Sequence, residues 1–434
     1  MTSRSGAEDG RLGVFAGPWH TGHVARDGAV LGFSDIERAT RRIESQESDN
    51  AWRVTWLDVS EFLGGRIAKR LANLDVVYAN CGPLAALLFG LREANGLNFR
   101  IVREVRTLGW VGYAFQEFIA RELERPGDVC AHVSNYCRDV WAPLETARGA
   151  LQHYPLLESS GQIDSGSGDA PGGNVRCGFF SRVTADKGFQ FVPEIIRRMK
   201  AVGWEITSLD VCGSSTDGEN FGKDASAAVE ALGVAVNFYG ELDYRRTMQI
   251  LTSTDIVLFP SVSSIESLGR VTVEAASRGK IVIASDFCGA HDIFPPECLI
   301  PLVIDNIVSG PSSDSFAIGE LDLERWTPPT PQVTLAARYD AYVSDSDKYL
   351  RILAPAGPAS GRNVENPDAG AMIAMAFDWD QLAERSAQDW CAKIAIRLAA
   401  ESRSRADLLD LGGAMKRSIV GEGFAPEVSF SASA

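Results

Sequence analysis

Long apolar segments are absent from this sequence of 434 residues, whose apolar runs all stay below ten residues. Spanning a bilayer takes about 20 apolar residues, so the sequence predicts no transmembrane helix. The polar start, MTSRSGAEDGR, has no apolar core behind its charges, and we expect no secretory signal. CxxC pairs are also absent, which argues against a zinc site or a disulfide framework. The eight cysteines are scattered and indicate small buried residues in a reducing cytoplasm.

Positively charged residues are fewer than negatively charged ones, with 42 Lys and Arg against 57 Asp and Glu, which gives a formal net charge of −15. Residues 1–157 hold 18 Lys and Arg against 19 Asp and Glu, a net of −1, and the remainder holds 24 against 38, a net of −14. Nucleic-acid binding needs a basic surface, so we expect none. The near-neutral first part leaves open a local basic face. We therefore expect a cytoplasmic protein, with peripheral contact at the inner face of a membrane left open.

The chain is too long for one hydrophobic core, and its composition divides it. Apolar strands alternate with helices over 1–157, which indicates a doubly wound parallel sheet. The alternation returns over 175–376, after a Gly-, Ser- and Asp-rich segment at 158–174 that is typical of a flexible linker. Within this second domain, about 301–371 is rich in Pro, Gly and Ser, as expected of a long-loop insertion. A last segment, 377–434, begins with an amphipathic helix.

The clearest strand–loop–helix–strand unit runs over 255–286. An apolar run at 256–259 ends at a proline, and a serine-rich loop then carries one carboxylate, Glu266. A helix is predicted over 270–277 and carries Glu274. Loops of this kind lie at the carboxyl ends of strands, where open parallel sheets bind ligands. Taken alone, Glu266 could be a solvated loop charge and Glu274 a helix-start carboxylate favoured by the dipole.

Two cations, Arg182 and Lys187, follow the predicted strand 176–180 of the same domain. Two cations suit a diphosphate, with each charge-assisted contact contributing roughly 1.5–3 kcal/mol. Carboxylates accept hydrogen bonds from sugar hydroxyls. Cations for phosphate beside carboxylates for hydroxyls predict a nucleotide-sugar site. No DxD-like pair follows a strand, so we expect the cations to take the place of a metal and expect no cofactor.

Several motifs, in a fixed order, resemble the retaining GT-B glycosyltransferases of glycosyltransferase family 4, the group 1 glycosyltransferases. ESLGRVTVE places two glutamates eight positions apart, and Gly279 and the strand IVIASD follow. Upstream, FFSRVTADKGF resembles the family's Gly-Arg-Leu…Glu-Lys-Gly segment, and VNFYGELDYRRTMQILTSTDIVLFPS resembles its usual lead-in. FDWDQLAERSAQDW resembles the Phe-Ser-Trp-Glu helix that closes the family's chains. The resemblance covers about 175–293 and 377–392.

This resemblance implies an α/β fold of GT-B architecture, with two doubly wound Rossmann-like domains facing across a cleft and the C-terminal helix crossing back to the first domain. It assigns Glu266 to the transferred sugar and Glu274 to the ribose hydroxyls of a UDP- or GDP-type donor. It further implies retention of configuration by front-face attack, with the leaving phosphate assisting deprotonation of a hydroxyl acceptor. The groups implied at the donor's phosphates or sugar are Arg182, Lys187, the backbone amides near Leu268 and Gly269, and, from the first domain, Gly17 and Gly22.

The first domain carries fewer signals. His20 and His23 stand in a glycine-bearing loop that could approach a phosphate, although loop histidines are often ordinary surface residues. Many family members have a histidine after the strand near residue 100, where this chain reads REVRT, so Arg106 takes that place. Arg106 or Glu104 could bind the sugar or the acceptor, or form a structural ion pair.

Three functions remain open at this stage. The first is a retaining glycosyltransferase that moves a sugar from a nucleotide-diphosphate donor to a glycan, a lipid-linked glycan or a small natural product. The second is another enzyme on the same architecture, a sugar-nucleotide epimerase or a phosphorylase. No lysine context for pyridoxal phosphate is evident, which disfavours the phosphorylase, and an epimerase leaves the paired glutamates unexplained. The third is a protein that binds nucleotide sugars without catalysis.

Overall fold

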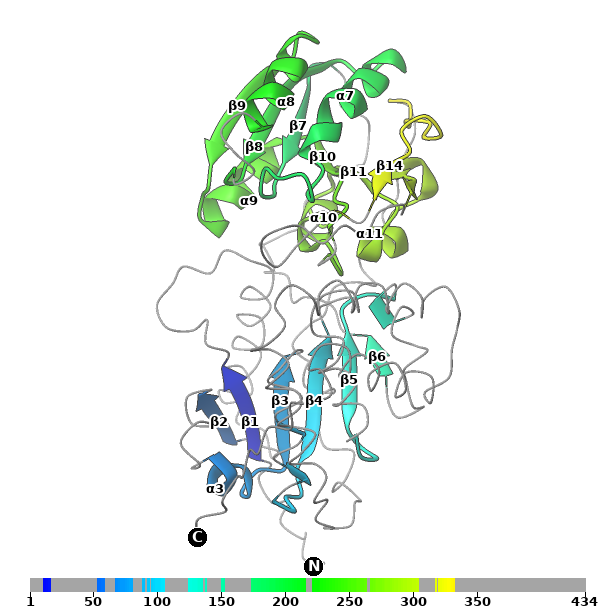
Figure 1. Cartoon of the computed structure of the whole chain (residues 1–434). Coiled ribbons are helices and arrows are strands. Elements are labelled where there is room, and N and C mark those ends of the chain that lie inside the picture. The colour runs from blue at the N-terminus through cyan, green and yellow to red at the C-terminus, as the bar shows by residue number, and fades with distance from the viewer. Residues whose placement is uncertain are drawn as a thin grey trace, which may run out of the picture. The chain divides into compact units, whose positions relative to one another are not determined.

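The computed structural model divides the chain into two compact units, shown in Figure 1. The described residues are 11–16, 53–58, 67–80, 88–89, 92–93, 95–105, 124–135, 137–138, 150–152, 173–215, 221–263, 266–303, 317 and 319–331. Among them, the first unit contains the strands up to residue 152, and the second contains Ser134–Cys137 and the residues from 173 onwards.

The first unit is built on a parallel sheet with the strand order β2-β1-β3-β4-β5-β6. Its elements are β1 (Arg11–Ala16), β2 (Arg53–Asp58), α3 (Ile67–Leu71), β3 (Val76–Asn80), β4 (Arg100–Val105), β5 (Val129–His132) and β6 (Ala150–Gln152). Strand β4 is buried along its whole length, as expected for a strand in the middle of a parallel sheet. Its sequence, RIVREV, nevertheless contains three charged residues, so their partners must lie inside the unit.

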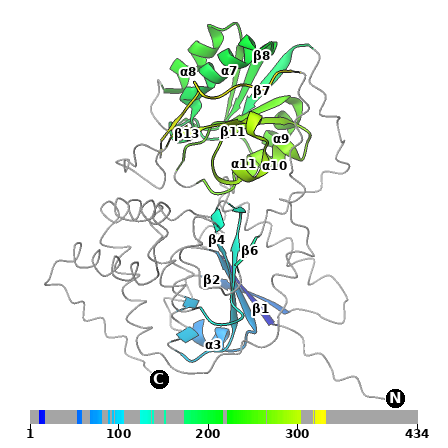
Figure 2. The same cartoon turned by 90° about the vertical axis from the view of Figure 1, so that its right-hand side faces the viewer.

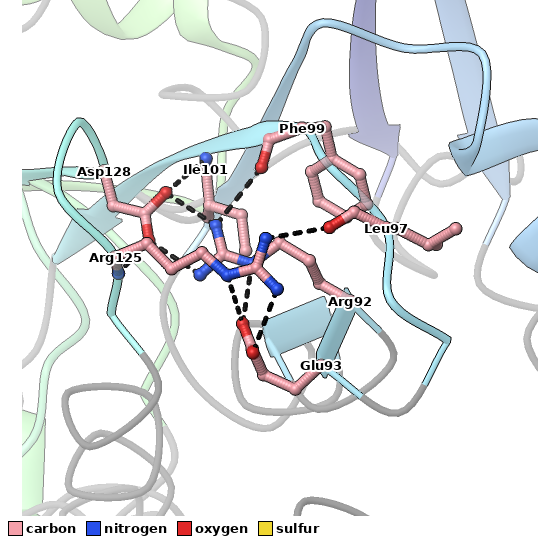
Figure 3. A network of polar contacts seen from close by, with 7 residues as sticks. All are labelled: Arg92, Glu93, Leu97, Phe99, Ile101, Arg125 and Asp128. Atoms are coloured by element: carbon pink, nitrogen blue, oxygen red, sulfur yellow. Dashed lines mark hydrogen bonds and ion pairs between the residues drawn. The ribbon is translucent and has the colours of Figure 1, made fainter. Parts of the chain in front are cut away.

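One group of buried charges at the start of β4 is neutralised internally (Figure 3). Asp128 accepts from both terminal guanidinium nitrogens of Arg92, at 2.7 and 2.8 Å, and the Arg92 side chain is fully buried. The same carboxylate accepts from the backbone amides of Ile101 at 2.8 Å and Arg125 at 2.7 Å. Glu93 pairs with the Arg125 side chain at 2.8 Å. The network joins the turn before β5 to the start of β4, at the amino ends of the strands, so we assign it to folding and not to ligand binding.

The second unit contains a parallel sheet with the order β12-β11-β10-β7-β8-β9. Its strands are β7 (Val175–Phe179), β8 (Ile206–Cys212), β9 (Ala235–Gly240), β10 (Ile256–Phe259), β11 (Ile281–Ser285) and β12 (Leu299–Ile300). The strand order reverses between β7 and β10, because β8 and β9 lie on one side of β7 and the later strands on the other. Such a reversal leaves a crevice at the carboxyl ends of the two strands, where doubly wound sheets bind ligands.

Helices cover both faces of this sheet, with α7 and α8 on one side and α9 and α10 on the other (Figure 2). The helical elements are η3 (Phe189–Phe191), α7 (Val192–Ala201), α8 (Phe221–Glu230), α9 (Tyr244–Ser253), α10 (Arg270–Ala276), α11 (Cys288–Ile293) and η4 (Pro296–Cys298). Helix α7 shows why the chain folds this way, since it buries Val192, Ile195, Ile196 and Met199 at helical spacing. Helix α9 begins at Asp243, whose carboxylate accepts from the Arg246 amide at 2.8 Å.

The predicted fold class is confirmed for the described residues, which form two α/β units with doubly wound parallel sheets. The strands predicted at 176–180 and 256–259 are observed at Val175–Phe179 and Ile256–Phe259. The segment 377–434, with the amphipathic helix predicted at its start, lies outside the described residues, as does all but 173–174 of the predicted linker. The exact domain boundaries stay predictions. In the described part of the chain, no helix combines the length and the apolar character needed to cross a bilayer.

Part of the predicted insertion at 301–371 is ordered against the second unit. Strands β13 (Leu302–Val303) and β14 (Glu320–Leu321) form a short antiparallel pair. Trp326 is 4% exposed, and its indole nitrogen donates to the carbonyl oxygen of Glu297 at 3.3 Å. The described stretch 319–331 is therefore a packed segment of this unit, which a proline- and serine-rich composition alone does not reveal.

Candidate active site

The candidate site lies where the sheet of the second unit reverses its strand order. Strands β7 and β10 are hydrogen-bonded neighbours, and the loop after β7 therefore begins beside the loop after β10. The first loop carries Arg182 and Lys187, and the second carries Glu266. Sequence reasoning placed these residues after two separate strands. The strand order brings the two loops together.

The two loops touch through their backbones. The amide of Val262 donates to the carbonyl oxygen of Asp186 at 2.8 Å. Gly188 lies against Pro260 so closely that an added Cβ atom would stand 1.9 Å from the Pro260 carbonyl oxygen. Its φ of +76° is also a conformation that side chains rarely adopt. Glycine at this position is what allows Lys187, its neighbour in the chain, to approach the loop after β10.

We expect Gly188→Ala to lower the activity of this candidate site at least about tenfold, because the clash with Pro260 would move the two loops apart, and displaced groups in an active site lose rate steeply. The measurement is kcat/KM together with the thermal unfolding temperature. Gly233→Ala is the matched control, because Gly233 has a φ of +74° and nothing within 4 Å of an added Cβ. Equal effects of both substitutions would show that backbone strain, and not the contact between the loops, is responsible.

Glu266 is held by several groups at the meeting point of the loops. Its Oε2 pairs with Nζ of Lys187 at 2.8 Å, and both side chains are mostly buried, at 14% and 12% exposure. The Ser261 hydroxyl donates to Oε2 at 3.1 Å, and the Gly269 amide donates to Oε1 at 3.1 Å. These contacts show that Glu266 is not a freely solvated loop charge, which was the plain alternative for this residue.

Arg182 and Asp186 form a second ion pair in the loop after β7. The Arg182 guanidinium, 42% exposed, lies 3.3 Å from the Asp186 carboxylate, and the Thr184 hydroxyl donates to the same carboxylate at 2.5 Å. Burial alone would raise the pKa of Asp186, but the charge of Lys187, the Thr184 hydrogen bond and the charge of Arg182 outweigh it and lower that pKa. Asp186 is therefore ionised at neutral pH and keeps both cations at the end of β7.

Glu274 lies in the interior of α10, and its side chain is buried, with 3% of the residue exposed. Oε1 accepts from Nε of Arg270 at 2.7 Å and from the Tyr244 hydroxyl at 3.0 Å. Burial raises the pKa of Glu274, and the charges of Arg270 and Arg278 and the Tyr244 hydrogen bond oppose that rise. The first turn of α10 contains no acidic residue, so interpreting Glu274 as a helix-start carboxylate is wrong.

Leu268 and Gly269 join the loop to α10. Leu268 is 7% exposed, and Gly269 is in the left-handed region, with φ 71° and ψ 61°, at the start of the helix. The resemblance pointed to backbone amides near these residues as ligands of the donor. In the structure the Gly269 amide donates to Glu266, so this amide fixes the carboxylate.

Helix α11 supports the same loop, and sequence reasoning did not find this. The Cys288 thiol donates to the carbonyl oxygen of Glu266 at 2.7 Å, and burial raises the pKa of that thiol well above its ordinary value. Cys288 has a φ of 56°, an uncommon conformation for a residue with a side chain. Gly289 packs against Leu268, whose carbonyl oxygen would lie 2.4 Å from an added Cβ. The left-handed backbone of Cys288 marks a conformationally constrained position, and no feature of the sequence predicts it.

The predicted residues of the first domain are only partly described. Glu104, at the carboxyl end of β4, is 1% exposed and accepts a hydrogen bond from the Tyr78 hydroxyl. The other predicted residues of this domain, namely Gly17, His20, Gly22, His23 and Arg106, lie outside the described residues. The described residues include no group of three or more His, Cys, Asp or Glu side chains placed to hold a metal ion.

Comparison with solved structures finds many chains that align with this one along most of their length at low sequence identity. HepE from Anabaena, in complex with UDP and glucose, is 14% identical, with a TM-score of 0.45 over 94% of this chain and 98% of that one. Sucrose-phosphate synthase from Thermosynechococcus elongatus is 13% identical, with a TM-score of 0.47 over 90% and 99%. The lipopolysaccharide outer core galactosyltransferase WaaB is 12% identical, with a TM-score of 0.47 over 90% and 99%.

Comparison with sequences is more specific. No curated protein matches the chain significantly. Residues 165–298, however, match the model of the family described as "Glycosyl transferases group 1". The match spans β7 to η4 and includes the ion pair of Lys187 with Glu266 as well as the buried Glu274. The second unit therefore carries a domain similar to the group 1 glycosyltransferases.

Proposed function

We propose that this protein is a retaining glycosyltransferase of the family 4 type, which moves a glycosyl group from a nucleotide-diphosphate sugar to a hydroxyl acceptor. The observation that carries the proposal is the Lys187–Glu266 pair, 2.8 Å apart, at the strand-order reversal of a domain that matches group 1 glycosyltransferases. A cation can bind a phosphate, and a carboxylate can accept hydrogen bonds from a sugar hydroxyl, so a site that holds both suits a nucleotide sugar.

We assign separate parts of the donor to separate residues. Lys187 and Arg182 stand in the loop after β7 and supply positive charge for the diphosphate. We assign Glu266, in the loop after β10, to the transferred sugar, and Glu274, on α10, to the ribose. Each charge-assisted contact contributes roughly 1.5–3 kcal/mol, which offsets part of the cost of association. The proposed site needs no metal, because the two cations neutralise the phosphates.

The proposed reaction breaks the bond between C1 of the sugar and the phosphate oxygen, and the bonding electron pair stays on the phosphate. The acceptor oxygen attacks C1 on the same face, so the anomeric configuration is retained. The acceptor proton passes to an oxygen of the departing phosphate. Lys187 and Arg182 stabilise the charge that develops there, and Glu266 orients the sugar. Preorganised charge of this kind is usually the largest contribution to catalysis.

We expect one or more nucleotide sugars to raise the thermal unfolding temperature of the full chain, because a ligand at about 100 times its Kd stabilises the folded state by roughly 2.7 kcal/mol. The test is a panel of UDP- and GDP-sugars, each measured with and without EDTA. Donor consumption, with water or methanol as acceptor, is followed by NMR, which also identifies the anomer formed. Loss of binding or turnover in EDTA would overturn the metal-independent site.

The same panel separates the three functions. Release of the nucleotide diphosphate with a retained anomer supports the transferase. Conversion of a donor into its sugar epimer would indicate the epimerase, and binding without turnover would indicate a non-catalytic protein. Inversion of the anomer would overturn the family 4 mechanism while leaving a glycosyltransferase. No binding of any member would sink the proposal as a whole.

A further inference from the structure

Two buried side chains donate to consecutive carbonyl oxygens of the loop that carries Glu266. The Cys288 thiol donates to the carbonyl oxygen of Glu266 at 2.7 Å, and the Ser134 hydroxyl donates to that of Ser267, also at 2.7 Å. The two donors are 1% and 0% exposed. Ser134 belongs to the second unit, as the loop does, although the two are 133 residues apart in the sequence. Sequence reasoning selected neither donor for the site.

These two hydrogen bonds fix the main chain that follows the Cα atom of Glu266. A peptide group is planar, so a donor that holds its carbonyl oxygen also fixes the direction of the next amide. The peptide groups 266–267 and 267–268 are both held in this way. Among the described residues, neither carbonyl oxygen has a second donor. A buried carbonyl group that loses its donor is left unsatisfied, so the chain would have to turn to regain a partner.

The start of the loop is held in the same manner. The hydroxyl of Ser285, the last residue of β11, donates to the carbonyl oxygen of Ser261 at 2.5 Å, and Ser285 is 1% exposed. The hydroxyl of Ser261 donates in turn to Oε2 of Glu266 at 3.1 Å. Buried side chains outside the loop therefore hold its backbone both before and after Glu266.

We propose that Ser134, Ser285 and Cys288 are positioning residues, which hold the loop in the conformation that places Glu266 in the candidate active site. This inference rests on the proposed function, because it takes Glu266 to contact the transferred sugar. The three residues act through backbone carbonyl oxygens and do not touch the donor. Such support matters because a displacement of about 1 Å in an active site can lower the rate about a hundredfold.

The first test follows hydrogen exchange of the ligand-free full chain by mass spectrometry. In the wild type, the Glu266 amide donates to the Ser263 carbonyl oxygen and the Gly269 amide donates to the Glu266 carboxylate, so both report on opening of the loop. We expect alanine at any of the three positioning residues to speed exchange over 261–269 about tenfold and to leave β8 unchanged. Unchanged exchange over 261–269 would overturn the inference, whatever the activity of the protein.

The second test measures kcat and nucleotide binding separately. We expect the same three alanine variants to lower kcat at least about tenfold and to leave the Kd of UDP or GDP within about threefold, because a free nucleotide has no transferred sugar for Glu266 to contact. Cys288→Ser keeps a proton donor and should keep kcat within about threefold of the wild type. Normal kcat in the alanine variants would contradict the proposal. Equal losses of kcat and of nucleotide binding would also contradict it, because they would indicate a general structural role.

Two further variants serve as controls. Ser226→Ala removes a hydroxyl that donates to the carbonyl oxygen of Gly222 at 2.7 Å on α8, and it should change neither loop exchange nor kcat. Ser134 also accepts from the Cys137 amide at 3.0 Å and so caps the helical turn that follows it. Glycine is a far better cap than alanine, so Ser134→Gly keeps most of the cap but loses the donor.

We expect Ser134→Gly to lower kcat as much as Ser134→Ala does. Near-normal kcat in the glycine variant would show that the cap, and not the contact with the Ser267 carbonyl oxygen, is responsible, and would remove Ser134 from the proposal. Absence of transfer by the wild type would overturn the proposed function, whereas unchanged exchange over 261–269 would overturn only this inference. The two failures are therefore distinguishable.

Discussion

Glu266→Gln is expected to lower the rate of glycosyl transfer at least about a hundredfold, the effect seen when one preorganised group is removed from an active site. The carboxylate lies at the junction of the two loops, paired with Lys187 at 2.8 Å. Glutamine has nearly the same size, and its carbonyl oxygen can still accept from the Gly269 amide. The substitution therefore removes the negative charge and one acceptor, and leaves the loop in place. The measurement is kcat, and kcat/KM for the donor.

The controls for this prediction separate chemistry from folding. Glu194→Gln makes the same chemical change on the exposed side of α7, where Glu194 pairs with Arg197 at 2.6 Å, and it should leave transfer unaffected. The unfolding temperature of Glu266→Gln is expected to stay within about 5 °C of the wild type. Lys187→Ala should likewise reduce transfer by orders of magnitude, since the departing phosphate would lose a cation. Near-normal turnover in both Glu266→Gln and Lys187→Ala would remove these residues from the proposed chemistry.

The approach of Lys187 to Glu266 could be expected from the sequence, whereas the contacts that fix Glu266 could not. Both residues follow apolar runs that become β7 and β10, and loops at the carboxyl ends of neighbouring parallel strands lie close together. The thiol of Cys288 is different, because it donates to the Glu266 carbonyl oxygen from a residue whose own backbone is left-handed, at the start of α11. Periodicity finds elements of several turns. A helix of six residues and a two-residue strand such as β12 are too short to show it.

Tyr244 and Glu274 show a second limit of the sequence. The helix predicted over 270–277, which carries Glu274, is observed as α10, and Tyr244 is the first residue of α9. A period of 3.6 residues tells which face of each helix is apolar, but not which polar residue of one helix meets which residue of the other. The hydrogen bond between these two side chains joins residues 30 positions apart. Such a pair is fixed by how the helices pack on the sheet.

The buried charges of the first unit could not be predicted for a related reason. In the sequence, Asp128 follows Pro126 and Gly127, and this tripeptide predicts only the end of a helix. Charged residues in turns are usually exposed, yet Asp128 is 4% exposed and Arg92 is completely buried. Their burial depends on the exact fit of a guanidinium to a carboxylate 36 residues away. Neither the composition of the chain nor the spacing of its residues predicts that fit.

Asp128→Ala is expected to destabilise the first unit by about 3–5 kcal/mol, the usual result of removing one partner from a buried ion pair. The substitution removes both hydrogen bonds to the Arg92 guanidinium and those to the amides of Ile101 and Arg125. The guanidinium then keeps the Glu93 carboxylate, 3.2 Å from its Nε, but loses the carboxylate that both of its terminal nitrogens contact. The measurement is the free energy of unfolding from urea denaturation, with separate probes for the two units, because their transitions need not coincide.

Asp75→Ala provides the matched control for this prediction in the same unit. Asp75 pairs with the Arg11 side chain at 3.5 Å and accepts from the Arg11 backbone amide at 2.8 Å, and both side chains are exposed, at 43% and 51%. An exposed pair of this kind contributes at most about 1 kcal/mol, so Asp75→Ala should cost far less than Asp128→Ala. Asp128→Asn should fall between them, because an amide can still accept from the Ile101 amide but cannot neutralise Arg92. If Asp128→Ala and Asp75→Ala cost the same, the network in Figure 3 does not hold the start of β4 in place.

The network lies at the amino ends of the strands of the first unit. We therefore also expect Asp128→Ala to leave nucleotide binding by the second unit intact while that unit remains folded.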